Sequence, residues 1–377
     1  MEFTVPRRDL ADIVATAARA LPVRPPVPVL AGLRIGATAE GQLEVVGFDY
    51  EVSTRTEAAA AVTVPGAMLV PGRLLTDITR ALPDQPVHIT ADTTRATLTC
   101  GRAHYTLPLL PLDEFPALPQ APAAAGQVDA DVWAAAVTQV ATAAGRDDTL
   151  PVLTGIRVEV EGDKVTLAAT DRYRFAVREL LWKPHQADLP ATALVPAKTL
   201  LETSKALAAA GTVDLALGTT GRGDGLLGLS GPGLATTTRL LEGEFPKFRA
   251  LFPTEFTCIA TVSTHTLADA VKRVALVAER NTPVRLAFTQ GELTIEAGSS
   301  DDAQAVDRID ADLEGDNISI AFNPAYLLDG LAAINNPTAQ LSFTIATKPA
   351  LLQGRAAPDA APDDAYRYLI MPVRLSG

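Results

Sequence analysis

Two pairs of adjacent aspartates are the residues of this chain whose type and spacing could support acid–base or metal chemistry. They are Asp147-Asp148 and Asp301-Asp302, and each pair lies in a stretch with glycine or serine beside it. Aspartates in such stretches usually hold turns or cap helices, because their oxygens accept hydrogen bonds from nearby backbone N–H groups. The histidines are scattered without the spacing of a metal site: His88, His104, His185 and His265. We therefore expect no catalytic residue, no metal and no cofactor.

A glycine-rich stretch at residues 218–225 is the second place where chemistry could be expected. Its sequence, GTTGRGDG, lacks the Gly-Lys-Ser/Thr ending of a phosphate-binding loop. It therefore predicts the tip of a hairpin. A hydrolase that uses the scattered acids is the enzyme alternative, and these residues disfavour it.

Basic residues on predicted helices point to phosphate contacts as a further possibility. They are Arg8, Arg19, Arg73, Arg80, Lys198, Lys205, Lys272, Arg273 and Arg280. The chain as a whole has a formal net charge of −12 and a pI near 4.9, which by itself argues against tight nucleic-acid binding. The cations predict either ordinary solvated helix faces or a few loosely held phosphates.

The elements that carry these residues recur three times. A helix-like pattern at residues 8–14 returns at 131–137 and at 265–271. A second motif, in which a proline is followed within a few residues by leucines, occurs three times: at residues 69–75, 194–201 and 321–328. Its prolines, Pro71, Pro196 and Pro324, are 125 and 128 residues apart. A period of that length is the size of a domain and not of a solenoid repeat.

Each repeat has the pattern of two helices and several antiparallel strands. Apolar residues recur at i, i+3, i+4 and i+7 in the first helix, for example Leu10, Ile13, Val14 and Ala17. Alternating stretches flank glycine turns in each repeat: residues 33–36 with 43–46, 156–160 with 165–167, and 286–288 with 293–295. The proline of the second motif is typical of a helix start. The sequence thus predicts an α+β fold.

Length and composition agree with three folded domains. The chain has 377 residues, of which 47% are hydrophobic, and about 100–200 residues make a domain. A Pro/Ala stretch at 116–122 marks the first boundary, and the second falls near Pro253. We expect domains at residues 1–120, 121–252 and 253–377.

Cellular location is indicated by what the sequence does not contain. The first residues lack the basic and apolar segments of a signal peptide, and no apolar run is long enough to span a membrane. The two cysteines, Cys100 and Cys258, lie in different predicted domains, which disfavours a disulfide framework. We expect a cytoplasmic protein.

Four short motifs, in register with the three repeats, resemble those of the bacterial DNA sliding clamp, the beta subunit of DNA polymerase III. They are VPVL at 27–30, TDRYRFAV at 170–177, FPKF at 245–248 and MPVRL at 371–375. The resemblance covers the whole chain. It implies three clamp domains, each with two helices packed on antiparallel sheets. It also implies a head-to-tail homodimer that forms a six-domain ring around duplex DNA.

The same resemblance implies function and partners. A sliding clamp is a non-catalytic processivity factor that encircles DNA without sequence specificity. It tethers the polymerase III alpha subunit, in a complex that also contains a 3′–5′ exonuclease, and it binds the clamp loader, other polymerases and repair proteins through short linear motifs. The alternative is a clamp paralogue with an altered pocket that sequesters or resists peptide-like inhibitors.

Three sets of site residues are implied by the resemblance. The peptide pocket comprises Leu153, Thr170, Arg172, Tyr173, Arg174, Phe175, Pro246, Leu251, Asn323, Tyr326, Thr347, Pro349, Leu369, Ile370, Met371, Pro372, Val373, Arg374 and Leu375. DNA contacts comprise the loop residues Arg24 and Arg146 with the helix cations Arg73, Arg80, Lys198, Lys205, Lys272, Arg273 and Arg280. The dimer contacts place Ile78 and Leu82 against Leu276 and Val277. Phe175, Arg172 and Tyr173 predict a narrower and more basic pocket than is usual in the family.

Overall fold

The computed structural model describes residues 1–186, 190–218, 225–278, 282–298 and 303–374. Each of the three repeats contributes two α-helices, as the periodicity predicted: α1 (Arg7–Ala17), α2 (Gly72–Ala81), α3 (Ala130–Ala141), α4 (Ala197–Leu207), α5 (Thr264–Val274) and α6 (Pro324–Ile334). Short 3₁₀ helices join several elements: η1 (Ala18–Ala20), η2 (Pro28–Ala31), η3 (Leu112–Glu114), η4 (Pro151–Thr154), η5 (Arg249–Leu251) and η6 (Ala275–Val277).

The strands of the first compact unit form two sheets. This unit comprises residues 1–131, 182–191 and 202–240. The smaller sheet has the order β5 (Ala61–Val64), β1 (Glu2–Val5), β7 (Val87–Ala91), β8 (Arg95–Cys100), β9 (Ala103–Pro108). The larger has the order β14 (Lys183–Pro184), β10 (Gly126–Asp129), β16 (Thr212–Leu217), β17 (Leu226–Gly231), β18 (Leu234–Arg239), β4 (Val52–Ala59), β3 (Gln42–Phe48), β2 (Gly32–Ala37), β6 (Gly66–Pro71).

The second compact unit comprises residues 132–181, 192–201 and 241–377 and is built on one long sheet. Its strand order is β15 (Ala191–Pro196), β11 (Gly155–Glu161), β12 (Lys164–Thr170), β13 (Arg174–Leu181), β26 (Tyr366–Ile370), β25 (Ala350–Arg355), β24 (Thr338–Phe343), β19 (Cys258–Ser263), β22 (Ala305–Gly315), β21 (Gly291–Ala297), β20 (Val284–Thr289), β23 (Ile318–Phe322). The middle repeat therefore contributes strands to both units, because β18 pairs with β4 and β13 pairs with β26.

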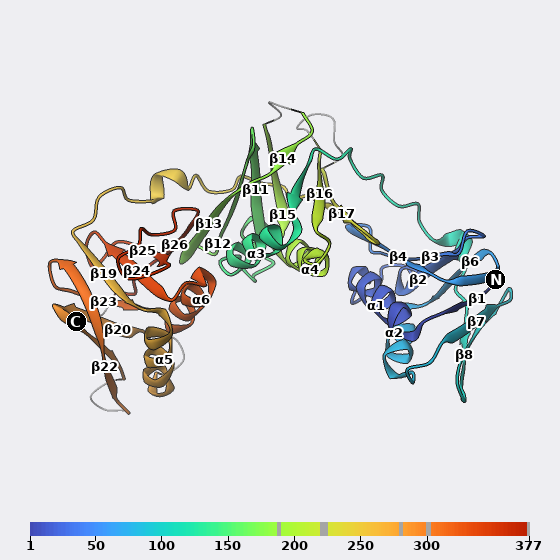
Figure 1. The fold of residues 1–377 in the computed structure, drawn as a ribbon, viewed down its shortest axis with the longest axis horizontal. Coiled ribbons are helices and arrows are strands. Elements are labelled where there is room, and N and C mark those ends of the chain that lie inside the picture. Colours follow the sequence, from blue (N-terminus) through green and yellow to red (C-terminus); the bar gives the residue numbers. More distant parts are fainter. Residues whose placement is uncertain (187–189, 219–224, 279–281, 299–302, 375–377) are drawn as a thin grey trace. The chain divides into compact units, whose positions relative to one another are not determined.

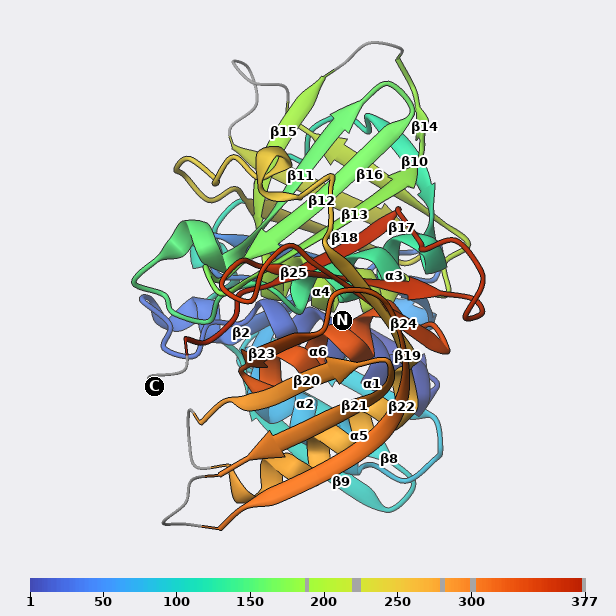
Figure 2. The ribbon, with the colours of Figure 1, turned by 90° about the vertical axis from the view of Figure 1, so that its left-hand side faces the viewer.

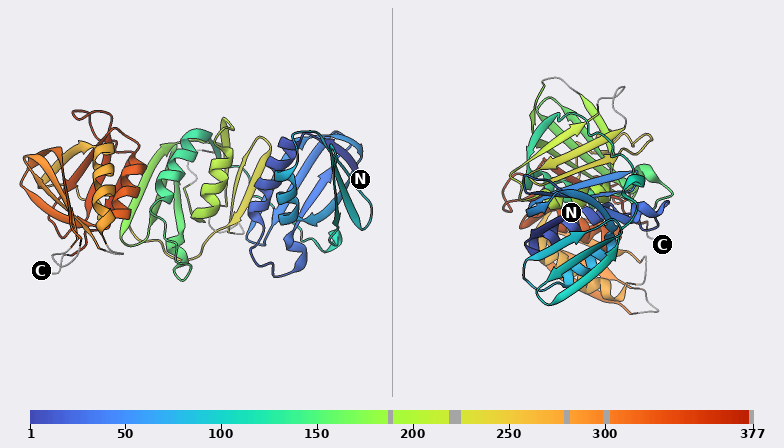
Figure 3. Two further views of the ribbon diagram at one scale, coloured as in Figure 1. Left: turned by 90° about the horizontal axis from the view of Figure 1, so that it is seen from below. Right: turned by 90° about the vertical axis from the view of Figure 1, so that its right-hand side faces the viewer.

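The predicted helix stripes face the cores. Leu10, Ile13, Val14 and Ala17 of α1 are buried, and α1 packs beside α2 against β3 and β4 (Figures 1 and 3). In the third repeat α5 packs beside α6 and against β21 and β22 (Figures 1 and 2). The stripe of α5, which is Leu267, Ala270, Val271 and Val274, is buried in the same way. Burial of an apolar stripe is what stabilises helices as short as these.

The three predicted hairpins are also confirmed. Strand β2 pairs with β3, β11 with β12, and β20 with β21, all antiparallel. Cys100 and Cys258 are both buried free thiols. In the described part of the chain no helix is long and apolar enough to cross a membrane.

Side-chain caps begin the two helices of the third repeat. The Asn323 side-chain oxygen accepts the N–H groups of Ala325 (2.9 Å) and Tyr326 (3.4 Å) at the start of α6. Ser263 accepts the N–H of Thr266 (3.4 Å) at the start of α5. Such caps satisfy donors that have no partner within the helix. Asn323, which we expected in the peptide pocket, therefore has a structural role in this fold.

We expect Asn323→Ala to lower the free energy of unfolding by about 1 kcal/mol, because the first turn of α6 loses its cap. Asn323→Ser should retain most of the stability, since serine also caps well. Urea unfolding of the three proteins would measure both effects. An unchanged midpoint for Asn323→Ala would contradict the assignment.

Candidate functional site

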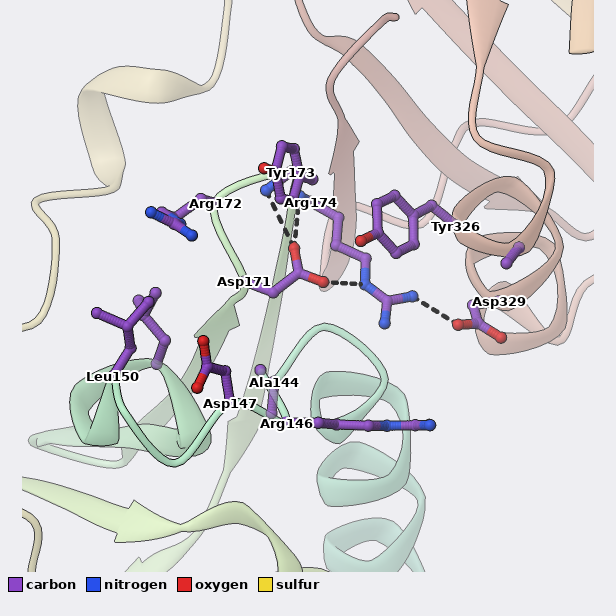
Figure 4. Close-up of a pocket in the computed structure, with 13 residues that line it drawn as sticks. Ala144, Arg146, Asp147, Leu150, Asp171, Arg172, Tyr173, Arg174, Tyr326 and Asp329 are labelled. Atoms are coloured by element: carbon purple, nitrogen blue, oxygen red, sulfur yellow. Dashed lines mark hydrogen bonds and ion pairs between the residues drawn. The ribbon is translucent and has the colours of Figure 1, made fainter. Parts of the chain in front are cut away.

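A cavity of about 570 Å³ opens in the second compact unit, where a turn, a loop and a helix meet (Figure 4). The turn joins β12 to β13, the loop follows α3, and the helix is α6. Five of the residues predicted for the peptide pocket line it: Leu153, Arg172, Tyr173, Arg174 and Tyr326. Arg146, which the sequence assigned to DNA contact, lines it as well.

Asp171 shapes the turn. Its Oδ1 accepts the backbone N–H groups of Tyr173 (3.0 Å) and Arg174 (3.1 Å), and its Oδ2 accepts the Nε–H of Arg174 (2.9 Å). Between them Arg172 has a φ of +81°, a left-handed conformation that costs a non-glycine residue roughly 1–2 kcal/mol. The turn thus holds Arg172 in a strained conformation with its side chain exposed at the cavity.

Arg174 connects this turn to α6. Its guanidinium is bound by Asp171 on one side and by Asp329 on the other, with 2.6 Å from Nη1 to Oδ2 of Asp329 (Figure 4). Burial alone would lower the pKa of Arg174, but Tyr368, Asp329 and Asp171 more than offset this and raise it. The side chain is 7% exposed and stays charged, so the pocket wall contains a paired, buried cation.

Tyrosines form the adjacent wall. The Tyr173 and Tyr326 rings are stacked with their centroids 6.1 Å apart, and the Arg174 guanidinium lies 4.5 Å from the Tyr326 centroid. The hydroxyl of Tyr368 donates to the carbonyl of Tyr326 at 2.9 Å. Burial raises the pKa of Tyr368, which keeps that hydroxyl a donor. The result is an aromatic surface with directional polar groups, as ligand pockets commonly have.

The C-terminal segment closes one side of the site through its backbone. The N–H of Met371 donates to the carbonyl of Tyr173, and the N–H of Val373 donates to that of Ala321, both at 2.8 Å. Leu369 and Ile370 are buried, whereas Met371, Val373 and Arg374 are exposed. The segment therefore passes from the core to the surface between Ile370 and Met371. Leu375 lies outside the described residues.

Phe175 does not line the described cavity. It is 4% exposed and contacts three phenylalanines of the following linker, at centroid distances of 5.3 Å to Phe248, 5.8 Å to Phe245 and 6.2 Å to Phe252. These rings belong to a small apolar core with Leu369. The structure thus assigns Phe175 to packing beneath the site.

The remaining predicted pocket residues lie outside the cavity lining. Thr170 is buried, and its hydroxyl donates to the Arg174 carbonyl at 2.7 Å. Four others are exposed or half-buried: Pro246, Leu251, Thr347 and Pro349. Pro372 is half-buried beside Met371.

The sequence interpretation did not assign three acidic residues to the site. Asp171 lies inside the TDRYRFAV motif, and its Asp-x-x-Arg spacing could have indicated the turn. Asp329 follows Tyr326 by three residues on α6, and helical spacing could have placed the two side chains on one face. Asp147 lines the cavity from the loop after α3, and hydrogen bonds from Thr149 lower the pKa of its carboxyl.

The possible catalytic residues are not brought together. Asp147 holds its own turn, and Asp301-Asp302 lie outside the described residues, as do residues 219–224 of the glycine-rich stretch. The four histidines have different partners: His88 contacts Thr4, His104 contacts Thr99, His185 contacts the Ala124 carbonyl, and His265 contacts Asp269.

The cations of the predicted helices and of the predicted DNA-contacting loops differ in their partners. Arg8, Lys272 and Arg273 are paired with Asp84, Asp269 and Asp307, and Arg19 donates to the Glu202 carbonyl. Arg73 donates to two carbonyls of the loop after α1. Within the described ranges, five have no side-chain hydrogen bond or ion pair: Arg24, Arg80, Arg146, Lys198 and Lys205. Arg280 lies outside the described residues.

The predicted dimer contacts are unequally exposed. Leu276 is 86% exposed on η6, and Val277 beside it is half-buried. Ile78 and Leu82 are 7% and 4% exposed within the core of the first repeat. An apolar side chain as exposed as Leu276 is available to a partner surface.

Three family models match consecutive parts of the chain. They describe the DNA polymerase III beta subunit: its N-terminal domain at residues 1–119, its central domain at 127–247 and its C-terminal domain at 249–374. The three matches follow the order of the three repeats.

Relatives and solved structures agree over the full length. A beta sliding clamp of Streptomyces coelicolor is 64% identical over 377 residues, covering 100% of both chains. A beta sliding clamp homolog, GriR, of Streptomyces muensis is 48% identical over 374 residues, or 99% of each. The crystal structure of a Bacillus subtilis DNA polymerase sliding clamp matches with a TM-score of 0.90 at 27% identity, and covers 100% of both chains.

We expect Phe175→Leu to lower the free energy of unfolding by about 1–2 kcal/mol, because the apolar core beneath the site loses ring contacts and gains a void. Thermal unfolding compared with Leu181→Ala, a change at an exposed strand position, would measure it. Equal stability of Phe175→Leu and the unaltered chain would show that the ring packs elsewhere.

Proposed function

We infer the assembly and the ligands of this chain from one premise: the chain belongs to the family of DNA polymerase III beta subunits, the bacterial beta sliding clamps. It is a processivity factor of DNA polymerase III and a non-catalytic subunit. The observation that carries this is the ordered match of three domain models along the whole chain. The resemblance that the motifs indicated and the α+β fold of three clamp domains are thereby confirmed. We propose that the three clamp domains span residues 1–120, 121–252 and 253–377.

Two copies of the chain pair head to tail and close a ring of six domains. Unlike ends that meet in a heterologous contact form a ring when the rotation closes. Leu276, with Val277, anchors the contact from the third domain, and the surface over Ile78 and Leu82 receives it. The exposure of Leu276 supports its role as the apolar anchor.

Duplex DNA passes through this ring without sequence-specific contacts. Among the predicted DNA-contacting cations, the five that have no side-chain partner in the described residues, Arg24, Arg80, Arg146, Lys198 and Lys205, supply weak phosphate contacts. A ring that encloses DNA does not need to bind it tightly. A chain of net charge −12 can therefore serve, provided that these five cations face the duplex.

The cavity at Arg174 captures short linear segments of partner proteins, among them the polymerase III alpha subunit and the clamp loader. The stacked tyrosines offer area at low entropic cost, and the exposed side chains of Met371 and Val373 extend the apolar surface. The 64% identity to the Streptomyces coelicolor beta sliding clamp over the full length supports a working clamp over a sequestering paralogue.

Leu276→Asp tests the ring. We expect the unaltered chain to have twice the mass of 39.5 kDa in solution and, after loading, to stay on nicked circular DNA until the DNA is linearised. The variant should be a monomer and should not be retained, because a buried unpaired charge would replace the anchor. Leu181→Asp, at an exposed strand position, is the matched control and should behave as the unaltered chain does. A monomeric unaltered chain, or equal retention on linear DNA, would refute the ring.

Tyr173→Ala tests the pocket. A fluorescent peptide with the clamp-binding segment of the alpha subunit should bind at least about tenfold more weakly, because an aromatic anchor is lost. The control is Tyr50→Ala, since Tyr50 is a similarly exposed tyrosine on the equivalent turn of the first repeat. Equal affinity of Tyr173→Ala and the unaltered chain would place the peptide elsewhere.

A further inference from the structure

The loop between η1 and η2 in the first repeat is short of its own hydrogen bonds. Its residues 21–27 include Pro22, Pro25 and Pro26, which have no N–H to donate. Backbone bonds close the two flanking 3₁₀ helices, from Leu21 to Ala18 and from Leu30 to Val27. In this described stretch no backbone–backbone bond joins residues 22–26 to each other. Carbonyls of such a loop depend on donors from elsewhere.

The first turn of α2 supplies that donor. The Nη2 of Arg73 donates to the carbonyls of Pro22 (3.0 Å) and Val23 (3.1 Å). The preceding residue, Gly72, is buried, and a Cβ there would lie 2.4 Å from Leu21 Cδ1. The absence of a side chain at Gly72 thus lets the base of the loop pack directly on the helix. Two consecutive residues of α2 therefore fix the loop.

The loop at residues 21–27 exposes the cation Arg24 on a backbone that prolines restrict. Arg24 is exposed and has no hydrogen bond or ion pair among the described residues, and its neighbour Val23 is 79% exposed. The prolines on both sides restrict the backbone through their fixed φ. The position of the Arg24 guanidinium therefore depends on where the loop is held, which is at Arg73.

We propose that Arg73 is a positioning residue, which holds the loop so that Arg24 meets a DNA phosphate, and that Arg73 does not itself contact the DNA. This proposal rests on the proposed function as a DNA-encircling ring. It refines the sequence interpretation, in which Arg73 and Arg24 were equivalent DNA contacts. The Nη2 of Arg73 is already used by two loop carbonyls, whereas the Arg24 side chain has no hydrogen-bond or ion-pair partner among the described residues.

The second repeat offers an internal comparison. Lys198 follows Pro196 in the same way that Arg73 follows Pro71, yet its side chain is exposed and has no partner in the described ranges. The corresponding loop of the second repeat, which follows α3, is stabilised by hydrogen bonds within the loop. Asp147 accepts the N–H and the hydroxyl of Thr149 at 3.0 and 2.6 Å. Where the loop supplies its own turn, the helix cation is left free.

A double-mutant cycle on the full-length protein distinguishes positioning from direct contact. The measurement is binding of a fluorescent DNA duplex over a series of salt concentrations, for Arg24→Ala, Arg73→Met and the double variant. Each phosphate contact contributes about 0.9 to the slope of log K against log salt. We expect each single variant to lose about 0.9, and the double variant to lose no more than that. A double variant that loses about twice as much would overturn the proposal.

Arg80→Met is the matched comparison, because Arg80 is an exposed cation on the same helix with no side-chain partner in the described part. If Arg80 contacts a phosphate, its loss adds to that of Arg24→Ala. The cycle then shows that it can detect a direct contact from α2.

Amide hydrogen exchange of the free protein measures how firmly the loop is held in the absence of DNA. In Arg73→Met the hydrogen-bonded amides at the two ends of the loop, Leu21 and Leu30, should exchange faster, while in Arg80→Met they should not change. Unchanged exchange in Arg73→Met would overturn the positioning role even if DNA binding fell. An unaltered chain with no salt-dependent DNA binding would instead refute the proposed function, and the exchange result would still decide whether Arg73 holds the loop.

Discussion

The buried guanidinium of Arg174 is the interaction on which the candidate pocket depends. A charge removed from water costs several kcal/mol unless it is paired and hydrogen-bonded. Arg174 satisfies this condition through Asp171 in its own turn and Asp329 on α6. Loss of either partner would leave a buried charge uncompensated, so the turn and the helix are held in one arrangement. The ring of Tyr326 covers the guanidinium and in turn stacks with Tyr173, so the aromatic wall follows from the same pair.

The same turn occurs in the first repeat without the buried arginine. Asp49 accepts the N–H groups of Glu51 and Val52 just as Asp171 accepts those of Tyr173 and Arg174. Tyr50 and Arg172 both have a positive φ between them. The first turn has Val52 where the second has the buried arginine, so it has no cation to pair with a helix carboxylate. The two turns share only the aspartate of their four residues, and the difference between Val52 and Arg174 decides which turn has a cation that pairs with a helix carboxylate.

The pairing of charges on the helices is compatible with the proposed ring. Several helix cations are paired with nearby carboxylates, as Arg273 is with Asp307, and surface pairs of this kind add little stability. Their effect is to reduce the number of free cations that can attract phosphate. The acidic chain with a few unpaired cations is consistent with weak, salt-dependent contacts. Tight binding would oppose sliding, so the pairing of these helix cations suits a sliding clamp.

The sequence by itself determined the threefold repeat, the two helices of each repeat and the central hairpins, because apolar periodicity and turn glycines are local signals. Motifs in register with these repeats were enough to identify the family. Tertiary structure alone decided the roles of individual side chains. Asn323 caps a helix, Phe175 packs under the site, and Arg73 holds a loop, although all three belong to motifs or patterns that suggested surface contacts. Such roles depend on which segments, distant in sequence, supply a donor, a ring or a carbonyl at a few ångströms. Periodicity and spacing record which face of an element is apolar, but they do not record what lies opposite it.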